Sequence, residues 1–379
     1  PPHMPALWYV DLSNTAIGNA TIASLPRCLQ TLALQNCPSV TPAAQLDHLV
    51  NLTTLHSSGT DLAPSTLTAC RARGCYAPAD GILRGHGSNK VLSLAALPDG
   101  AFASGDAGGT VRLWAACDHS GDRAYHAVGD GLVGHGGEVR ALVALHDGRH
   151  LAAGVCRTRG SVVVWDVRAV PPIRTTSIVC DRGVTALGQL AGHHLAVGCD
   201  DGSIHVVDTT AGMVTGAIMA GHTAGVTALV VLHDGSTLAS GSVDRTVRLW
   251  DVSAHVCIAT LVGHTEVVAA LAVTNDGRLA SASHDDSVRL WDTATGTCAG
   301  VLPSTFQVIA LTALSDGTLV GGAQFFDSID VRRIAGWQDF SRLDGHTCPV
   351  TALVALPGNR LASASGDGTV RLWQLPRLR

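Results

Sequence analysis

The stretch from Gly221 to Asp251 reads GHTAGVTALVVLHDGSTLASGSVDRTVRLWD, and its landmarks return twice more along the chain. Each copy carries a Gly-His pair, then Ser, Asp and Trp at closely similar spacing. The three sets are His222, Ser240, Asp244 and Trp250, then His264, Ser281, Asp285 and Trp291, then His346, Ser363, Asp367 and Trp373. Self-similarity with a period of about 40 residues indicates a repeated structural unit rather than an active site.

Seven short apolar segments extend this period over residues 81–379, with starts 48, 45, 42, 42, 40 and 42 residues apart. They are Val91–Leu97, Val139–Leu145, Val184–Leu190, Val226–Leu232, Val268–Val273, Val308–Leu314 and Val350–Leu356. Most are followed by Asp-Gly, which supplies the positive φ of a tight hairpin. A small-residue segment such as Leu238–Ser240 and an alternating one such as Thr246–Trp250 come next, so each unit is predicted to be a series of antiparallel strands.

Further in-register motifs resemble those of the WD-repeat family over about residues 80–379. Trp-Asp pairs stand at 165–166, 250–251 and 291–292, and Gly-His pairs at 85–86, 134–135, 221–222, 263–264 and 345–346. The resemblance implies a mainly β fold, a seven-bladed β-propeller of four-stranded antiparallel blades around a channel. It also implies that Gly81–Arg84 completes the blade ending at Trp373, which closes the ring without a long unpaired edge.

In that family, the His, Ser, Asp and Trp of one blade form a hydrogen-bonded network, and the resemblance assigns this structural role to the twelve residues above. The remaining blades, numbered in chain order, keep only part of the set. Blade 1 has His86, Ser104 and Trp114, with Gly108 at the Asp position. Blade 2 has only His135 and Trp165. Blade 3 has Asp201 with Val207 at the Trp position, and blade 6 has only Asp327. We expect blades 2, 3 and 6 to be held more by packing and to be locally softer.

Residues 1–78 carry a different period and are predicted as a separate domain from residues 79–379. Leu7-x-x-Val10-x-Leu12 is followed by related segments beginning at Leu29 and Leu52, 22 and 23 residues later. This spacing resembles the leucine-rich repeat and implies a short α/β solenoid, with Cys70–Cys75 as its cap and further repeats before Pro1. An irregular leucine-rich extension packed on the propeller is the alternative interpretation.

Composition excludes several functional classes. The net charge is −5 and Lys90 is the only lysine, which argues against a dedicated nucleic-acid binder. There is no G-x-x-x-x-G-K-[ST] phosphate loop, and the 18 histidines show no metal-ligand spacing, so no cofactor and no metal are predicted. Eleven cysteines without C-x-x-C spacing, and no apolar run of transmembrane length, indicate a cytoplasmic or nuclear chain.

The recurring Ser, His and Asp could suggest a hydrolase, but three copies at similar spacing fit a structural role better. No G-x-S-x-G elbow is present either, so no catalytic residue is predicted and the chain is expected not to be an enzyme.

The loops that follow Gly-His and those that precede each Asp form the predicted partner-binding face. Blade 6 places Phe306, Phe325 and Phe326 there, out of five phenylalanines in the chain. Exposed aromatics suit a binding hot spot, although folding inward to replace the missing Trp is the alternative. The other candidates are charged: Glu266 and His284 of blade 5, and Arg157, Arg159 and Arg182 of blades 2 and 3, which form either an anion-facing cluster or solvated loop charge.

One further motif, Trp165-Asp166-x-Arg168, resembles the W-D-x-R pattern of propellers that act as substrate receptors of cullin-type ubiquitin ligases. Under that hypothesis these three residues would bind the ligase adaptor. The leading hypothesis is a non-enzymatic scaffold that binds protein or peptide partners within a multiprotein assembly. A ubiquitin-ligase receptor and an RNA-associated propeller are the alternatives, and the sequence predicts no oligomeric state.

Overall fold

The computed structural model describes residues 9–12, 16–25, 31–33, 39–41, 46, 54–56, 81–119, 122–304, 306–324, 328–333 and 340–375. The chain divides into two compact units. One contains residues 1–83 with 116–124, and the other contains residues 84–115 with 125–379.

The described residues of the first unit form a small parallel sheet and one short helix. Its elements are β1 (Tyr9–Asp11), α1 (Asn19–Ala23), β2 (Thr31–Ala33) and β3 (Thr54–His56), with the strands in the order β1-β2-β3. Tyr9 pairs with Thr31 and Thr31 pairs with Thr54, offsets of 22 and 23 residues that equal the periods of the sequence. Asn19 donates from Nδ2 to Thr41 Oγ1 at 2.7 Å, one period away. The cap predicted at Cys70–Cys75 lies outside the described residues.

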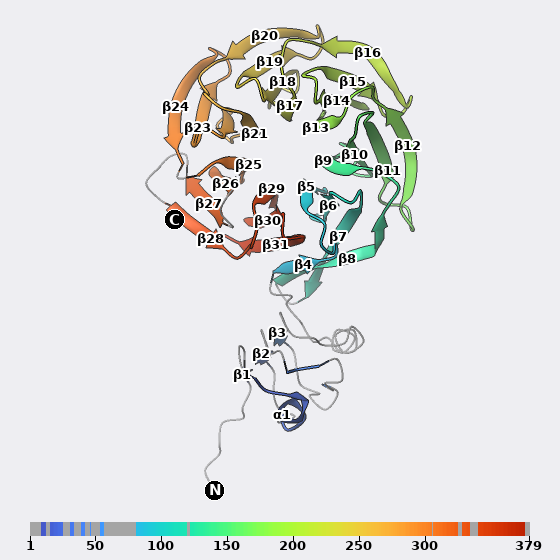
Figure 1. Ribbon diagram of the computed structural model, residues 1–379, viewed down its shortest axis with the longest axis vertical. Helices are drawn as coiled ribbons and strands as arrows, with labels where there is room; N and C mark the ends of the chain where they lie inside the picture. Colours follow the sequence, from blue (N-terminus) through green and yellow to red (C-terminus); the bar gives the residue numbers. More distant parts are fainter. Residues whose placement is uncertain are drawn as a thin grey trace. The chain divides into compact units, whose positions relative to one another are not determined.

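The second unit is a β-propeller whose blades are four-stranded sheets, and the described residues form seven such sheets (Figure 1). Blade 1 contains β5 (Val91–Ala96), β6 (Phe102–Asp106), β7 (Val111–His119) and β8 (Asp122–Leu132). Blade 2 contains β9 (Glu138–Ala144), β10 (His150–Cys156), β11 (Ser161–Asp166) and β12 (Ile173–Val179). Blade 3 contains β13 (Val184–Gln189), β14 (His194–Cys199), β15 (Ile204–Asp208) and β16 (Met213–Met219).

The other four blades repeat this arrangement. Blade 4 contains β17 (Val226–Val231), β18 (Thr237–Ser242), β19 (Val247–Asp251) and β20 (Val256–Leu261). Blade 5 contains β21 (Val268–Val273), β22 (Leu279–Ser283), β23 (Ser287–Asp292) and β24 (Thr297–Pro303). Blade 6 contains β25 (Val308–Ala313), β26 (Thr318–Ala323), β27 (Ser328–Arg333) and β28 (Phe340–Asp344). Blade 7 contains β29 (Val350–Leu356), β30 (Arg360–Ser365), β31 (Thr369–Gln374) and, at its outer edge, β4 (Ile82–Arg84) from the start of the domain.

Each apolar segment of the sequence forms the innermost strand of its blade. These strands contact one another in series, from β5 through β9, β13, β17, β21, β25 and β29 back to β5, which closes the ring (Figure 1). A cavity of about 210 Å³ lies on the axis and is lined by residues from every one of these strands.

The Asp-Gly turns and a recurring bulge shape the blades. Gly100 and Gly235 have φ of 80° and 68°, as the hairpins between the first two strands require. At the start of β17 the pairing shifts between Val226 and Ala228, which leaves Thr227 as the extra residue. Its hydroxyl donates to the Val268 carbonyl of the next blade. Equivalent bonds join blade 3 to blade 4 and blade 7 to blade 1.

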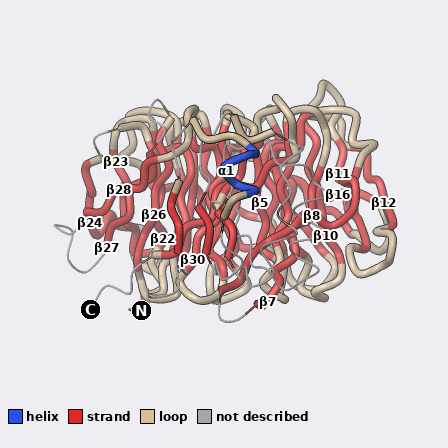
Figure 2. Tube along the Cα trace, turned by 90° about the horizontal axis from the view of Figure 1, so that it is seen from below, coloured by secondary structure: helices blue, strands red, loops and turns tan. Residues whose placement is uncertain are grey.

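The hydrophobic core lies between successive blades. The loops gather at the two ends of the strands, as the edge-on view in Figure 2 shows. Between blades 3 and 4, for example, fully buried Trp250 packs in one cluster with Val226 and Met219. Similar clusters join blades 1 and 2, 2 and 3, 4 and 5, 5 and 6, and 6 and 7. Each blade is therefore stabilised by its neighbours, as expected of stacked repeats.

Candidate functional site

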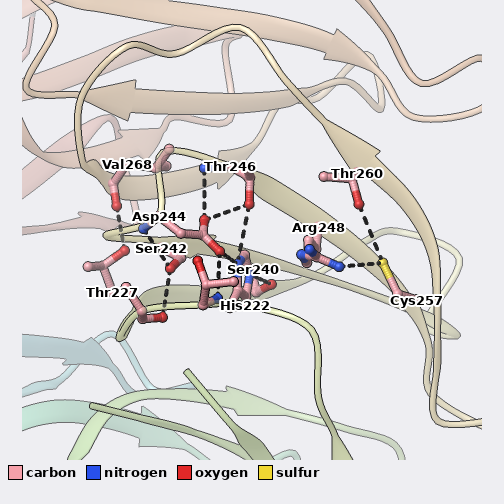
Figure 3. Close-up of polar contacts among 12 residues, drawn as sticks. His222, Thr227, Ser240, Ser242, Asp244, Thr246, Arg248, Cys257, Thr260 and Val268 are labelled. Atoms are coloured by element: carbon pink, nitrogen blue, oxygen red, sulfur yellow. Dashed lines mark hydrogen bonds and ion pairs between the residues drawn. The ribbon is translucent and has the colours of Figure 1, made fainter. Parts of the chain in front are cut away.

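Blade 4 shows how the repeated residues meet, and Figure 3 draws three of them, His222, Ser240 and Asp244. The indole Nε1 of Trp250 on β19 donates to Ser240 Oγ on β18 at 2.8 Å. Ser240 Oγ lies 2.7 Å from His222 Nε2, and His222 Nδ1 lies 2.8 Å from Asp244 Oδ2. Because the Ser oxygen already accepts the indole hydrogen, its own hydrogen is directed to His Nε2, and His Nδ1 donates to the carboxylate.

The same three contacts occur in blades 5 and 7. Their distances are 2.8 Å for Trp291–Ser281, 2.7 Å for Ser281–His264, 2.8 Å for His264–Asp285, 2.8 Å for Trp373–Ser363, 2.7 Å for Ser363–His346 and 2.9 Å for His346–Asp367. The twelve residues are thus brought together as three copies of one network.

The electrostatics of the network favour a neutral imidazole and an ionised carboxylate. Burial lowers the pKa of His222 and His264, and the neighbouring carboxylates only partly oppose this shift. For Asp244, burial raises the pKa, but hydrogen bonds from Thr246, the Thr223 N–H and His222 outweigh it and bring the pKa to about 2.

This geometry explains the Ser, His and Asp without catalysis. Ser240 is fully buried and its hydroxyl is engaged by both the indole and the imidazole, so no substrate can reach it. Among the described residues, no group of three or more His, Cys, Asp or Glu side chains could hold a metal ion. In the same part of the chain, no helix is long and apolar enough to cross a membrane.

Blade 1 corrects one expectation from the sequence. Gly108 stands at the Asp position, but Asp106, two residues earlier, supplies the carboxylate: its Oδ2 lies 2.7 Å from His86 Nδ1. Ser104 Oγ contacts His86 Nε2 at 2.6 Å and accepts from Trp114 Nε1 at 2.8 Å. The network is therefore complete. The signal missed in the sequence was an acidic residue at the end of the same strand, β6.

Blades 2 and 3 replace the network in two ways. In blade 2, Trp165 Nε1 donates directly to His135 Nε2 at 3.0 Å, and His135 Nδ1 donates to the Gly109 carbonyl at 2.8 Å. In blade 3, Cys180 and Val197 stand at the His and Ser positions, and with Val207 they belong to one buried apolar cluster. Burial raises the Cys180 thiol pKa to about 11, as expected of an unreactive core residue.

Of the three phenylalanines predicted on the blade 6 rim, the structure describes only Phe306, which folds inward. Phe306 is only 5% exposed and packs in the core cluster between blades 5 and 6, so its assignment as a partner-binding residue is wrong. Blade 6 lacks the Trp of the repeat, and an aromatic side chain recovers apolar burial there. Phe325, Phe326 and Asp327 lie outside the described residues.

The charged candidates lie in loops at one end of the strands. Glu266 is exposed beside half-buried His284 in blade 5, where burial lowers the His284 pKa and Glu266 partly opposes this. Arg157, Arg159 and Arg182 are exposed in blades 2 and 3. They differ in their partners, because Arg182 Nε lies 3.1 Å from Asp201 Oδ2.

The residues of the W-D-x-R motif are used within the propeller. Trp165 and Asp166 are buried, and Asp166 pairs with Arg149 at 2.7 Å. Arg168 pairs with Asp99 of blade 1 at 2.8 Å and donates from Nε to the Gly148 carbonyl at 3.1 Å. The arginine therefore ties blade 2 to blade 1.

Sequence reasoning also missed one charged residue on the channel wall. Arg140, from β9, lines the axial cavity and pairs with Glu138 at 2.8 Å. Its position inside an apolar inner strand was visible in the sequence as the only charge in the seven segments.

Comparison with known proteins identifies four of the repeats. The family model "WD domain, G-beta repeat" matches residues 80–115, 214–251, 255–292 and 337–374, which include the Trp residues of the four blades with a complete network. WD repeat-containing protein 18 of Mus musculus is 40% identical over 97 residues, 22% of this chain and 22% of the relative. The guanine nucleotide-binding protein subunit beta of Oryza sativa subsp. japonica is 29% identical over 175 residues, 43% of this chain and 44% of the relative.

These matches cover less than half of each relative's length. The four segments that match the family model contribute strands to four-stranded blades of the propeller. The chain therefore carries WD40 repeats, and they form a β-propeller.

Proposed function

We propose that the protein is a non-enzymatic interaction scaffold, a seven-bladed WD-type propeller that binds protein or peptide partners on one loop face. WD40 propellers are typically protein-interaction scaffolds, and the presence of WD40 repeats on a closed ring carries the proposal. The seven four-stranded sheets and the closed series of inner strands support the blade count.

The binding face is the end of the propeller that carries the Gly-His loops and the Asp turns. Exposed charges lie there, with Glu266 and Asp286 in blade 5 beside half-buried His284, and with the arginines in blades 2 and 3. Phe325 and Phe326, which the sequence predicts in a loop of blade 6, remain part of the proposal. Charged rims around a fixed ring suit selective recognition, because charge complementarity sets orientation and suppresses wrong partners.

The first unit and the location of the chain belong to the same proposal. We infer a leucine-rich repeat segment at residues 1–78, supported by parallel strand offsets of 22 and 23 residues. Scattered cysteines without paired spacing support a reducing compartment, the cytoplasm or nucleus. A multiprotein assembly is the proposed setting.

No observation in the structure specifically favours the ligase-receptor hypothesis or the RNA hypothesis. The ligase-receptor hypothesis needs Arg168 for an adaptor, yet this side chain is paired with Asp99. The RNA hypothesis uses three arginines, of which Arg182 is paired with Asp201. The ligase-receptor hypothesis predicts that Arg168→Ala loses adaptor binding. The RNA hypothesis predicts an RNA affinity that falls steeply as salt is raised.

The proposal is tested by affinity purification of the tagged chain from its native cells, followed by mass spectrometry. The loop-face variants are Glu266→Ala/His284→Ala and Phe325→Ala/Phe326→Ala. The matched control is His193→Ala/His255→Ala. Its two residues are exposed and lie at the other end of the antiparallel strands, in the β13–β14 and β19–β20 turns.

We expect one or both loop-face variants to lose a defined subset of partners that the control retains. Identical partner sets for all variants would contradict the assignment of this face. Loss in the control alone would move the binding surface to the opposite end of the propeller.

A further inference from the structure

Blade 2 lacks a carboxylate that its sister blades use to satisfy a backbone donor. In blades 4, 5 and 7, the residue after the network His donates its N–H to the network Asp. These bonds run from Thr223 to Asp244 at 3.0 Å, from Thr265 to Asp285 at 3.0 Å and from Thr347 to Asp367 at 3.1 Å. Each carboxylate therefore sits among donors on the loop face.

The strand register identifies the equivalent positions in blade 2. Leu151 pairs with Trp165 as Leu238 pairs with Trp250. Asp244 lies six residues after Leu238, and the residue six after Leu151 is Arg157. Blade 2 therefore places a guanidinium where blades 4, 5 and 7 place a carboxylate.

The donors of this site remain, but their acceptor is gone. Gly136 follows His135 and is exposed, so its N–H corresponds to that of Thr223 in blade 4. The Arg157 side chain packs against Gly136. A Cβ atom at Gly136 would lie only 2.9 Å from Arg157 Nη1. His135 Nδ1 donates to the Gly109 carbonyl. This carbonyl replaces the missing carboxylate as the acceptor for the imidazole, but not for the Gly136 N–H.

Arg157 and Arg159 are free of internal ion pairs within the described ranges. Both are exposed and lie in the turn between β10 and β11, which is two residues longer than the corresponding turn of blade 4. The neighbouring acids Glu138 and Asp201 are already paired, with Arg140 and Arg182. Asp181 and Asp200 are the exposed acids nearby, in blade 3.

We propose that the loop face of blade 2 is a receptor for an acidic peptide, whose Asp or Glu carboxylate binds the Arg157 guanidinium beside the Gly136 N–H. Gly136 N–H and the guanidinium groups of Arg157 and Arg159 supply the donors, and arginine offers carboxylates a bidentate geometry. Arg140 lies at the channel wall and is already paired with Glu138, so Arg157 and Arg159 carry the proposed recognition. The inference rests on the proposed scaffold function and names the chemistry of one partner segment.

The test uses the whole chain and a fluorescein-labelled hexaglutamate peptide, with binding followed by fluorescence anisotropy at low ionic strength. The main variant, Arg157→Asp, installs the residue found at this position in blades 4, 5 and 7. It is expected to fold, and its thermal midpoint to be equal to or above that of the wild type. Arg157→Ala provides a second variant that removes the donor without adding a carboxylate.

The matched control is Arg245→Asp. Arg245 is exposed in the corresponding turn of blade 4, has φ of 71°, and corresponds to Asp286 of blade 5, with φ of 58°. It carries the same change in net charge as Arg157→Asp. Long-range electrostatics alone would therefore weaken binding equally in both variants.

We expect Arg157→Asp and Arg157→Ala to weaken hexaglutamate binding by about tenfold or more, and Arg245→Asp to leave it within about twofold. Equal losses in the two Asp variants, or no wild-type binding at millimolar peptide, would overturn the proposal. An oligouridylate that binds more tightly than the peptide, and loses affinity in Arg157→Asp, would replace the acidic peptide by RNA. The scaffold proposal is tested at blades 5 and 6, so it stands or falls separately.

Discussion

Blades 3 and 4 are neighbours with the same backbone plan and opposite interiors. In blade 4, His222, Ser240 and Trp250 form a chain of hydrogen bonds that ends on Asp244. In blade 3, the corresponding His, Ser and Trp positions hold Cys180, Val197 and Val207, and these side chains share an apolar cluster. Both interiors are buried, and both leave the sheet register intact.

The difference shows that the network positions work as a set. A buried polar group is tolerated when its partner is present and is costly when the partner is removed, whereas an all-apolar replacement avoids the cost altogether. Blade 2 agrees, because Trp165 and His135 bond directly once no Ser lies between them. A single residue moved between blades 3 and 4 should therefore destabilise either one.

The largest expected effect is the loss of the blade 4 indole. Trp250→Ala should lower the free energy of unfolding by about 3–5 kcal/mol, because it empties a fully buried site and leaves Ser240 with one partner fewer. Val207→Ala at the same position of blade 3 should cost about 2 kcal/mol, since it removes less apolar area. Urea unfolding followed by circular dichroism measures both. Equal losses of unfolding free energy in the two variants would contradict a difference in how blades 3 and 4 are stabilised.

Breaking the middle of the polar chain should come next in size. Ser240→Ala removes the hydroxyl that joins Trp250 Nε1 to His222 Nε2, at a cost of about 2–3 kcal/mol in the blade 4 geometry; a direct Trp–His bond like that of blade 2 would recover part of this cost. Ser253→Ala is the control, because Ser253 bonds Asp251 in an exposed turn. Urea midpoints are compared at neutral pH. A Ser240→Ala loss no larger than that of the control would contradict a cooperative network.

The reverse exchange tests the apolar blade. Val197→Ser places a hydroxyl in a cluster that offers it neither an indole nor an imidazole, and it should cost about 2 kcal/mol. The same residue type that stabilises blade 4 would thus destabilise blade 3. Thermal unfolding of Val197→Ser beside Val197→Ala separates the buried hydroxyl from the lost methyl groups. Identical midpoints for the two variants would count against this reasoning.

Acid should weaken the polar blades selectively. Burial lowers the pKa of His86, His222 and His264, so the unfolded chain binds more protons than the folded one below pH 6.5. Stability is therefore full above pH 6.5 and declines as the pH falls from there toward the folded-state values. The lowered pKa of Asp244 adds a further loss below about pH 4.

The measurement is the thermal midpoint between pH 7 and pH 5, for the wild type and for His222→Gln. The variant removes one of the titrating imidazoles, so its midpoint should change less over this range even though it starts lower. A steeper decline in His222→Gln would reverse the assigned sign.

The repeat positions were readable from the sequence because their chemistry is local. Asp-Gly fixed the hairpins and Val-x-Ala segments fixed the inner strands, so the strands lie where the spacing placed them. The register of β6 was harder, since Asp106 and Gly108 differ by two residues and both lie near the turn. Only the fold shows which of them reaches His86.

Side-chain direction and tertiary pairing were beyond the sequence. Phe306 sits in a loop by its spacing, yet burial in the core decides its orientation. Arg168 completes a short motif, yet the charge that it meets comes from Asp99, 69 residues away. A pattern read along one strand does not report what the neighbouring blade presents.

The smallest expected effect concerns the ion pair between Arg168 of blade 2 and Asp99 of blade 1. Arg168→Ala should lower the free energy of unfolding by less than about 1 kcal/mol, because its side chain and that of Asp99 are 48% and 43% exposed. A double-mutant cycle with Asp99→Ala isolates the pair, and its coupling should shrink further as salt is raised. Coupling well above 1 kcal/mol would mean that the blade 1–blade 2 junction depends on this pair. If Arg168→Ala instead removed a ligase adaptor from the purified partners while stability hardly changed, the motif would serve recognition, and the pairing with Asp99 would be what a bound adaptor displaces.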